Sequence, residues 1–106
     1  MPTLPANPTL TDVQLYVREL ERERGFSQQS GQQKALLLGE EIGELFKAIR
    51  KTDAQLRTDP RSTIGTIDEE LADILIYLCA IANRYGIDLE TAFRTKEEKN
   101  KQRTWA

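Results

Sequence analysis

The sequence predicts an all-α domain of four helices, and three observations lead to this prediction. Apolar residues recur every three or four positions, the β-branched residues follow the same spacing instead of alternating, and capping and stop residues divide the chain into four segments. A chain of 106 residues, 39% of them hydrophobic, is long enough for one small core. We therefore expect a single four-helix bundle that oligomerisation completes.

The chain is expected to divide into an arm and one helical domain. Residues 1–10 contain three of the four prolines, so we predict a flexible N-terminal arm there. The rest of the chain, residues 11–106, is predicted to form a single helical domain.

The first two helices are predicted from their start and stop signals. Thr11 is the expected N-cap of the first helix, with Gln14 three residues later as its capping-box partner. That helix is predicted over 12–24, because Gly25 is a typical stop residue. A polar loop then leads into a second helix, which is predicted over 33–51.

The last two helices follow a linker. Residues 52–65 contain an Asp-Pro step, a serine and a glycine, which indicate a linker and a short turn within it. Thr66 and Glu69 form a capping-box pattern that opens the third helix, and this helix is predicted to end at Gly86. Asp88 is the expected N-cap of the fourth helix.

The composition argues against several kinds of chemistry. The chain has no histidine, which excludes Ser-His-Asp and Cys-His catalysis and argues against a di-iron bundle built on Glu-x-x-His motifs. Its one cysteine, Cys79, excludes an intramolecular disulfide and a zinc site made of several thiolates. A bound metal is therefore expected to have oxygen ligands, which suit Mg²⁺, Mn²⁺ or Ca²⁺.

The charge balance and the hydropathy pattern argue against two kinds of partner. With 15 basic and 17 acidic residues the formal net charge is −2, which argues against a nucleic-acid binder that works by bulk charge. No apolar run reaches about 18 residues, so no membrane span is expected. The N-terminal segment lacks the basic and apolar regions of a secretory signal, and we expect a cytoplasmic protein.

Two of the predicted helices carry pairs of acidic residues beside an apolar face. On a helical wheel of the second helix, Glu41 and Glu44 border an apolar arc. Glu70 and Asp73 border a matching arc on the third helix. The two arcs consist of Leu38, Ile42, Leu45, Phe46 and Ile49, and of Ile67, Leu71, Ile74, Leu78 and Ile81. A solvated acidic surface would not normally have such neighbours.

The two helices also share one short pattern. The order acid, acid, apolar, small, acid, apolar begins at Glu40 and again at Glu69. Packing of the two helices would bring four carboxylates together, which is costly unless cations neutralise them or some acids stay protonated. A divalent metal is the simpler explanation, and Mg²⁺ commonly binds carboxylates together with substrate phosphates. The alternative is a solvated acidic surface, which one such pair alone would favour.

The C-terminal helix is predicted to end in a cationic strip. Its apolar face continues along one stripe into Lys96, Asn100 and Arg103. Two cations and an amide at this spacing suit phosphate binding. The alternative is an exposed charged tail, which the strip taken alone would favour.

In order along the chain, these segments resemble the MazG-like family of all-α nucleoside triphosphate pyrophosphohydrolases. The family pattern is ExxE followed by ExxD, which stand here as Glu41-Ile42-Gly43-Glu44 and Glu70-Leu71-Ala72-Asp73. The resemblance covers about residues 12–105. It implies the four-helix MazG-like fold and hydrolysis of an NTP or dNTP to the monophosphate and pyrophosphate, with Mg²⁺ or else Mn²⁺. Cleaning of the nucleotide pool is one role that such an activity serves.

The resemblance also implies roles for individual residues. The family's metal ligands match four acids, which are Glu41, Glu44, Glu70 and Asp73. Either acid of the first motif could accept the proton of the attacking water. Phosphate contacts are implied for Lys96, Asn100 and Arg103. Tyr77 matches an aromatic residue near the nucleotide, and Phe26 and Lys34 stand where relatives contact the base or a phosphate. Because family members assemble as dimers or tetramers, we expect a homodimer or homotetramer.

Two other functions are consistent with the same residues. A non-catalytic helical dimerisation or adaptor module would also explain the third helix, where Ile76, Cys79 and Ala80 add apolar surface away from the main arc. A phosphoribosyl-ATP pyrophosphohydrolase would keep the chemistry and change the substrate.

Overall fold

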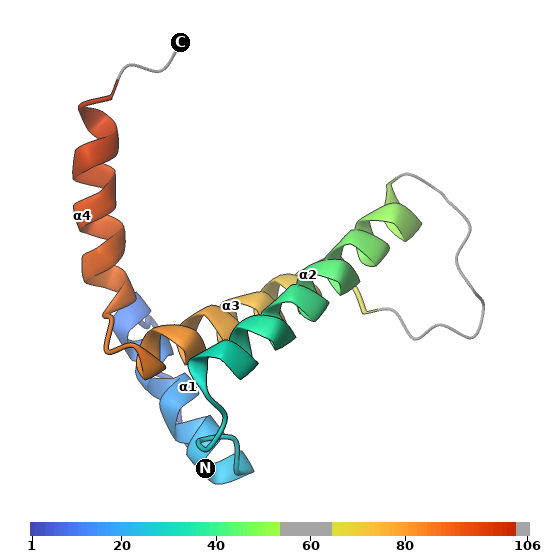
Figure 1. Cartoon of the computed structure of the whole chain (residues 1–106), viewed down its shortest axis with the longest axis horizontal. Helices are drawn as coiled ribbons and strands as arrows, with labels where there is room; N and C mark the ends of the chain where they lie inside the picture. Colours follow the sequence, from blue (N-terminus) through green and yellow to red (C-terminus); the bar gives the residue numbers. More distant parts are fainter. Residues whose placement is uncertain (54–64, 104–106) are drawn as a thin grey trace.

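The computed structural model describes residues 1–53 and 65–103, which form four helices in sequence order (Figure 1). They are α1 (Leu10–Arg24), α2 (Gly31–Thr52), α3 (Ile67–Arg84) and α4 (Leu89–Lys101). These residues contain no strand, so the all-α prediction is confirmed. The turn predicted within the linker lies outside the described residues. In the described part of the chain, none of the helices is long and apolar enough to cross a membrane.

The start of α1 differs from the sequence prediction. Thr9 is the N-cap: its hydroxyl accepts the Asp12 N–H at 3.1 Å, and the Asp12 carboxylate accepts the Thr9 N–H at 3.0 Å. The prediction of Thr11 and Gln14 as the capping pair was wrong, because both side chains are used elsewhere. The Thr11 hydroxyl donates to the Asp88 carboxylate at 3.0 Å, and the buried Gln14 amide donates to a backbone carbonyl of the α3–α4 turn.

Most other boundaries are close to those predicted. α1 ends at Gly25, whose φ of 79° is the left-handed conformation that favours glycine. α2 begins slightly earlier than expected, because Ser30 caps it and Gln33 closes the capping box. α4 has the expected N-cap, Asp88, whose side chain accepts an N–H of the first turn.

The capping box predicted for α3 is absent. Thr66 is the N-cap residue, but its side chain caps no helix N–H, because the hydroxyl donates to the Asp68 carboxylate. Glu69 is therefore not a capping partner. The helix ends at Arg84, shortly before Gly86, whose φ of 66° turns the chain toward α4.

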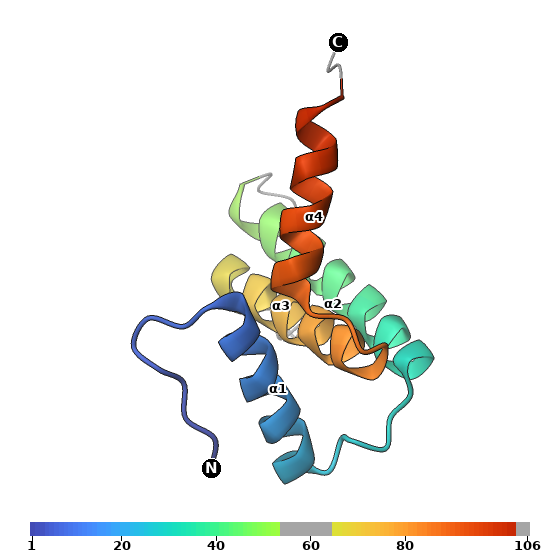
Figure 2. The ribbon, with the colours of Figure 1, turned by 90° about the vertical axis from the view of Figure 1, so that its left-hand side faces the viewer.

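The core of the chain lies between α1 and α3. α2 and α3 run antiparallel, α1 packs across α3, and α4 projects from the end of this assembly (Figures 1 and 2). Val17 and Leu20 of α1 pack against Cys79 and Ala80 of α3. Part of the α3 surface that the sequence placed away from the main arc, including Ile76, is thus covered by α1 within one chain.

The two predicted apolar arcs are only partly covered within one chain. Phe46 of α2 is 65% exposed and Leu71 of α3 is 52% exposed. The apolar faces of α2 and α3 are therefore open, and their exposed residues are Ile42, Phe46, Ile49, Leu71, Leu75 and Leu78.

Candidate functional site

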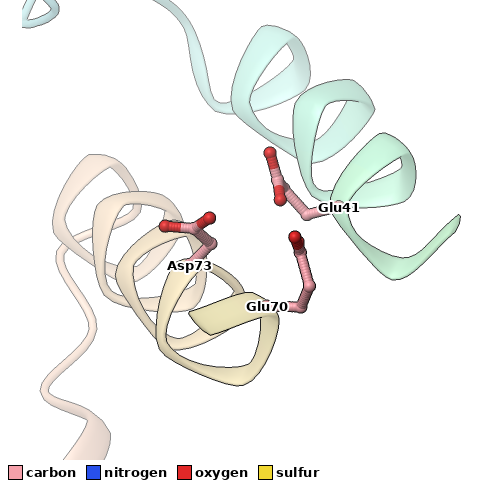
Figure 3. Close-up of side chains that lie close together, drawn as sticks. All are labelled: Glu41, Glu70 and Asp73. Carbon is pink, nitrogen blue, oxygen red and sulfur yellow. The ribbon is translucent and has the colours of Figure 1, made fainter. Parts of the chain in front are cut away.

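Three carboxylates converge between α2 and α3. Glu41 of α2 and the pair Glu70 and Asp73 of α3 point toward one another (Figure 3). One oxygen of each lies within 4.8 Å of the others. Three of the four acids that were predicted as metal ligands are thus brought together within one chain.

The helix geometry explains this acidic cluster. Glu70 and Asp73 are one turn apart near the start of α3, so they project from one side, and α2 places Glu41 opposite them. Glu70 is only 7% exposed. Gly65, just before the N-cap of α3, leaves room for Glu70, because a Cβ there would lie 2.5 Å from the Glu70 Oε1.

The electrostatics of the acidic cluster favour a cation. Burial, a hydrogen bond with Glu70 and the negative charges of Asp73, Glu70 and Glu44 raise the pKa of Glu41 to about 7. Near neutral pH the cluster therefore retains a proton that ordinary carboxyl groups would lose. The Glu70 Oε2 is buried and has no hydrogen-bond donor within the described residues. The retained proton and the buried oxygen without a donor are both expected of an anionic site that binds a positive ion.

The donor set fits a small, hard cation. Carboxylate oxygens are the ligands that Mg²⁺ and Mn²⁺ prefer. Three carboxylate oxygens within 4.8 Å of one another would be close enough to hold one such ion together. The buried Glu70 Oε2, which has no hydrogen-bond donor among the described residues, would gain a partner in such an ion. The acidic cluster therefore fits the metal that its motifs imply.

Glu44, the fourth predicted ligand, lies outside the group of converging oxygens. Its Oε1 is instead 3.6 Å from the Nζ of Lys47, the residue one turn further along α2. Its charge still contributes to the raised pKa of Glu41, so the two carboxylates interact. The predicted set of four is thus divided into three converging acids and one neighbour.

A small cavity adjoins the acidic cluster at Asp73. The cavity measures about 130 Å³, and its lining includes Phe26, Lys34, Asp73 and Tyr77. The Lys34 Nζ lies 5.0 Å from the centroid of the Phe26 ring and 5.3 Å from that of the Tyr77 ring. Three residues that the resemblance linked to substrate are therefore gathered beside the acids.

Two of these residues have properties that the sequence did not indicate. Lys34 is only 4% exposed, and its ammonium forms an ion pair with Glu21 at 3.0 Å, so it is not placed as a free surface cation. Burial, followed by the negative charges of Glu41 and its neighbours, raises the pKa of the Tyr77 hydroxyl. Tyr77 therefore remains a hydrogen-bond donor at neutral pH.

Sequence reasoning missed Glu21, which lines this cavity, and Arg84, which pairs with Glu21. Arg84 donates to both carboxylate oxygens of Glu21, at 2.8 and 2.9 Å. A signal was available, because Arg84 continues the stripe of α3 that runs through Asp73, Tyr77 and Ala80. A cation that follows a stripe leading to the buried Ala80 needs an anionic partner.

The C-terminal strip does not reach the acidic cluster within one chain. α4 packs against α1 and points away from α2 and α3 (Figures 1 and 2). Lys96 borders an apolar groove of about 500 Å³ together with Phe93, as the continuous stripe predicted. The Asn100 amide donates to Glu97 at 3.1 Å. Arg103 follows the end of α4.

Comparisons with known proteins agree on one family. Residues 28–105 match the family model described as the MazG nucleotide pyrophosphohydrolase domain. The dCTP pyrophosphatase 1 of Mus musculus is 36% identical over 100 residues, which cover 91% of this chain and 59% of that protein. The dCTP pyrophosphatase 1 of Homo sapiens is 37% identical over 101 residues, with the same coverage of 91% and 59%. The chain thus spans about three fifths of the length of these curated relatives.

A solved structure shares the fold. The crystal structure of iMazG from Vibrio DAT 722 matches with a TM-score of 0.64 at 31% sequence identity. The match covers 88% of this chain and 94% of that one. The four helices described above are therefore arranged as in a MazG fold.

We expect the metal-free chain to lose stability as the pH rises from about 5 to about 8. The folded chain binds a proton at Glu41 with a pKa of about 7, against the ordinary value of 4.5, and this advantage is lost as the pH passes through the folded value. Thermal unfolding in EDTA should show a falling melting temperature over this range. Mg²⁺ should raise the melting temperature more at the upper pH than at the lower.

The matched control is Glu98→Gln, at an exposed acid of α4 that pairs with Lys101. This variant should keep the pH dependence of the parent, whereas Glu41→Gln should remove most of it. A slope that persists unchanged in Glu41→Gln would contradict the assignment of the proton to this cluster.

Proposed function

The chain belongs to the MazG nucleotide pyrophosphohydrolase domain family, and on that premise we propose that it hydrolyses an NTP or dNTP to the monophosphate and pyrophosphate. Mg²⁺ is the proposed ion, with Mn²⁺ as its substitute. One observation carries the proposal: the carboxylates of Glu41, Glu70 and Asp73 adjoin a cavity that two aromatic rings line. A site suited to an ion with phosphates and a site suited to a base are therefore neighbours.

The relatives indicate which nucleotide to try first. The Mus musculus and Homo sapiens relatives are named dCTP pyrophosphatase 1, so dCTP is the first candidate substrate. Because the chain spans only about three fifths of their length, the other nucleoside triphosphates stay in the comparison.

Each acid has a proposed part in the reaction. Glu41, Glu70 and Asp73 would hold the ion, which when bound would neutralise phosphate charge and lower the pKa of a water molecule. Glu44 accepts the proton of the attacking water as the water oxygen bonds to phosphorus. The bond between the α- and β-phosphates breaks, and pyrophosphate leaves. We prefer Glu44 to Glu41 as proton acceptor because its half-exposed contact with Lys47 is weak and easily exchanged.

The cavity beside Asp73 suits the base of the nucleotide. Phe26 and Tyr77 offer ring surfaces for stacking. Lys34 lies near both rings, and only one of its ammonium donors is needed for the Glu21 carboxylate. A carbonyl or ring nitrogen of the base can accept the others, so we assign Lys34 to the base and not to the phosphates.

We further propose that the working unit is a homodimer or homotetramer closed over the apolar faces of α2 and α3. Large apolar side chains of both helices are exposed, among them Phe46, Leu71 and Leu78, and subunit interfaces commonly bury such surface. A second copy would be able to bring its own α4 to the acidic cluster, where Lys96, Asn100 and Arg103 would bind the phosphates. Such an assembly accounts for the separation of the cationic strip from the acids within one chain.

Two alternative functions would use some of the same residues. A non-catalytic dimerisation or adaptor module would use the open apolar faces and leave the acidic cluster without a role. A phosphoribosyl-ATP pyrophosphohydrolase would use the same ion and the same acids on a different nucleotide.

A substrate panel tests the proposal. With Mg²⁺ the chain should release pyrophosphate from at least one common NTP or dNTP, EDTA should stop the reaction, and Mg²⁺ or Mn²⁺ should restore it. Release from phosphoribosyl-ATP alone would assign the chain to that reaction. If no nucleotide releases pyrophosphate and Mg²⁺ does not change the melting temperature, the result would favour the adaptor module.

Two substitutions should separate ion binding from proton transfer. Glu70→Gln should lower kcat roughly 100-fold or more and also remove the rise in melting temperature with Mg²⁺, because it deletes a ligand. Glu44→Gln should lower kcat roughly 100-fold while leaving that rise in place. Glu98→Gln should match the parent in both measurements. Activity of Glu44→Gln within about a factor of two of the parent would remove Glu44 from the site.

The proposed assembly should be sensitive to charge on its apolar faces. Phe46→Asp places a charge on an exposed apolar residue of α2, so sedimentation velocity should show a shift toward the monomer. Leu4→Asp, at an exposed residue of the N-terminal arm, is the control and should leave the mass unchanged. A parent chain that already sediments as a monomer would refute the assembly.

A further inference from the structure

We propose that Glu21 and Arg84 are positioning residues that hold Phe26 and Lys34 in place around the base side of the cavity. The inference rests on the proposed function. It gives a role to a buried ion pair that neither the acidic cluster nor the proposed reaction uses.

Arg84 uses all five of its N–H donors within the chain. Its two terminal nitrogens donate to the Glu21 carboxylate oxygens at 2.8 and 2.9 Å. The remaining donors reach three backbone carbonyls, which are those of Gln29 at 2.5 Å, Ala80 at 2.8 Å and Phe26 at 2.9 Å. A guanidinium has five donors in a fixed fork. Arg84 is therefore fully occupied in holding the chain together and has no donor left for a ligand.

This arrangement fixes the segment that carries Phe26. The Phe26 N–H donates to the Glu21 backbone carbonyl at 2.8 Å, while the Phe26 carbonyl accepts from Arg84. The Gln29 carbonyl provides a second attachment of the same segment to Arg84. Because α1, α3 and the α1–α2 connection meet at one guanidinium, the backbone of Phe26 cannot move without breaking several hydrogen bonds.

Glu21 extends the arrangement to Lys34. Its Oε2 accepts from Lys34 at 3.0 Å and from Arg84 at 2.9 Å, and Glu21 is only 4% exposed. Burial alone would raise the pKa of Glu21, but the hydrogen bonds and charges of Arg84 and Lys34 outweigh it and lower the pKa. Glu21 therefore stays charged at neutral pH and keeps the Lys34 ammonium near the rings of Phe26 and Tyr77.

The consequence concerns the base and not the phosphates. Phe26 and Lys34 line the cavity, whereas the proposed ion and phosphates belong to the acidic cluster. Inorganic tripolyphosphate has no base and would need only the ion and the acids. Disturbing the ion pair should therefore weaken the binding of a nucleotide and leave the binding of tripolyphosphate unchanged.

Arg84→Lys is the sharpest variant, because it keeps a positive charge beside Glu21 and loses the fork that reaches the Phe26 and Gln29 carbonyls. For the best nucleotide of the panel we expect KM to rise about 10-fold or more and kcat to stay within about threefold of the parent. The inhibition constant of tripolyphosphate should not change. Arg22→Lys, the same substitution at an exposed arginine of α1, should leave KM unchanged.

Glu21→Gln provides a second variant of nearly the same shape. It weakens the hold on Lys34, so KM for the nucleotide should again rise while the inhibition constant of tripolyphosphate stays constant. A parental KM in both variants would overturn the inference. Equal weakening of the nucleotide and of tripolyphosphate would overturn it as well, because that result indicates a general loss of structure.

Amide hydrogen exchange gives a measurement that needs no activity. Exchange over residues 25–30 should be faster in Arg84→Lys than in Arg22→Lys, while α2 keeps the protection of the parent. Unchanged exchange over this segment would overturn the inference. A parent that releases no pyrophosphate would overturn the proposed function and the base-binding role with it, and the exchange rates would still decide whether Arg84 fixes the segment.

Discussion

Three carboxylates of like charge lie close together between α2 and α3. Glu41, Glu70 and Asp73 repel one another, and the cost in free energy is greatest for Glu70, which is buried. In the metal-free chain a bound proton reduces this repulsion, as the raised pKa of Glu41 indicates. A divalent cation would relieve the same repulsion more completely, because it would also give the Glu70 Oε2 a partner.

A second charged cluster, of opposite sign, meets the same cavity through Glu21 and Lys34 and includes Arg84, which pairs with Glu21. Glu21, Lys34 and Arg84 combine two cations with one carboxylate, and all three side chains are largely buried. The cavity therefore has Asp73 in its wall toward the acids and Lys34 in its wall toward the cations. An ion with phosphates suits the first, and the acceptor atoms of a base suit the second. Under the proposed function, these opposite charges would orient a bound nucleotide, with its phosphates toward Asp73 and its base toward Lys34. This orientation would not depend on which base the nucleotide carries.

The sequence predicted some helix ends and the meeting of three acids, but it did not predict two of the caps or the exact placement of side chains between helices. The stop at Gly25 and the cap at Asp88 depend on a few neighbouring residues, so local patterns identified them. The position of Glu44 outside the converging oxygens depends on which side of α2 faces α3. The burial of Lys34 depends on Glu21, which comes from another helix. Neither the position of Glu44 nor the burial of Lys34 can be predicted from the hydrophobic periodicity of one helix.

The apolar arcs explain why hydrophobic periodicity and the structure of one chain differ. Hydrophobic periodicity identifies every apolar face of a helix. It does not distinguish a face covered by another helix of the chain from a face covered by another subunit. Here α1 covers the side of α3 that carries Cys79, and the faces that carry Phe46 and Leu71 stay open. These are faces of α2 and α3, the two helices that supply the acidic cluster. A second copy packed on them would fix the distance between α2 and α3, and with it the separation of the carboxylates that a bound ion would require.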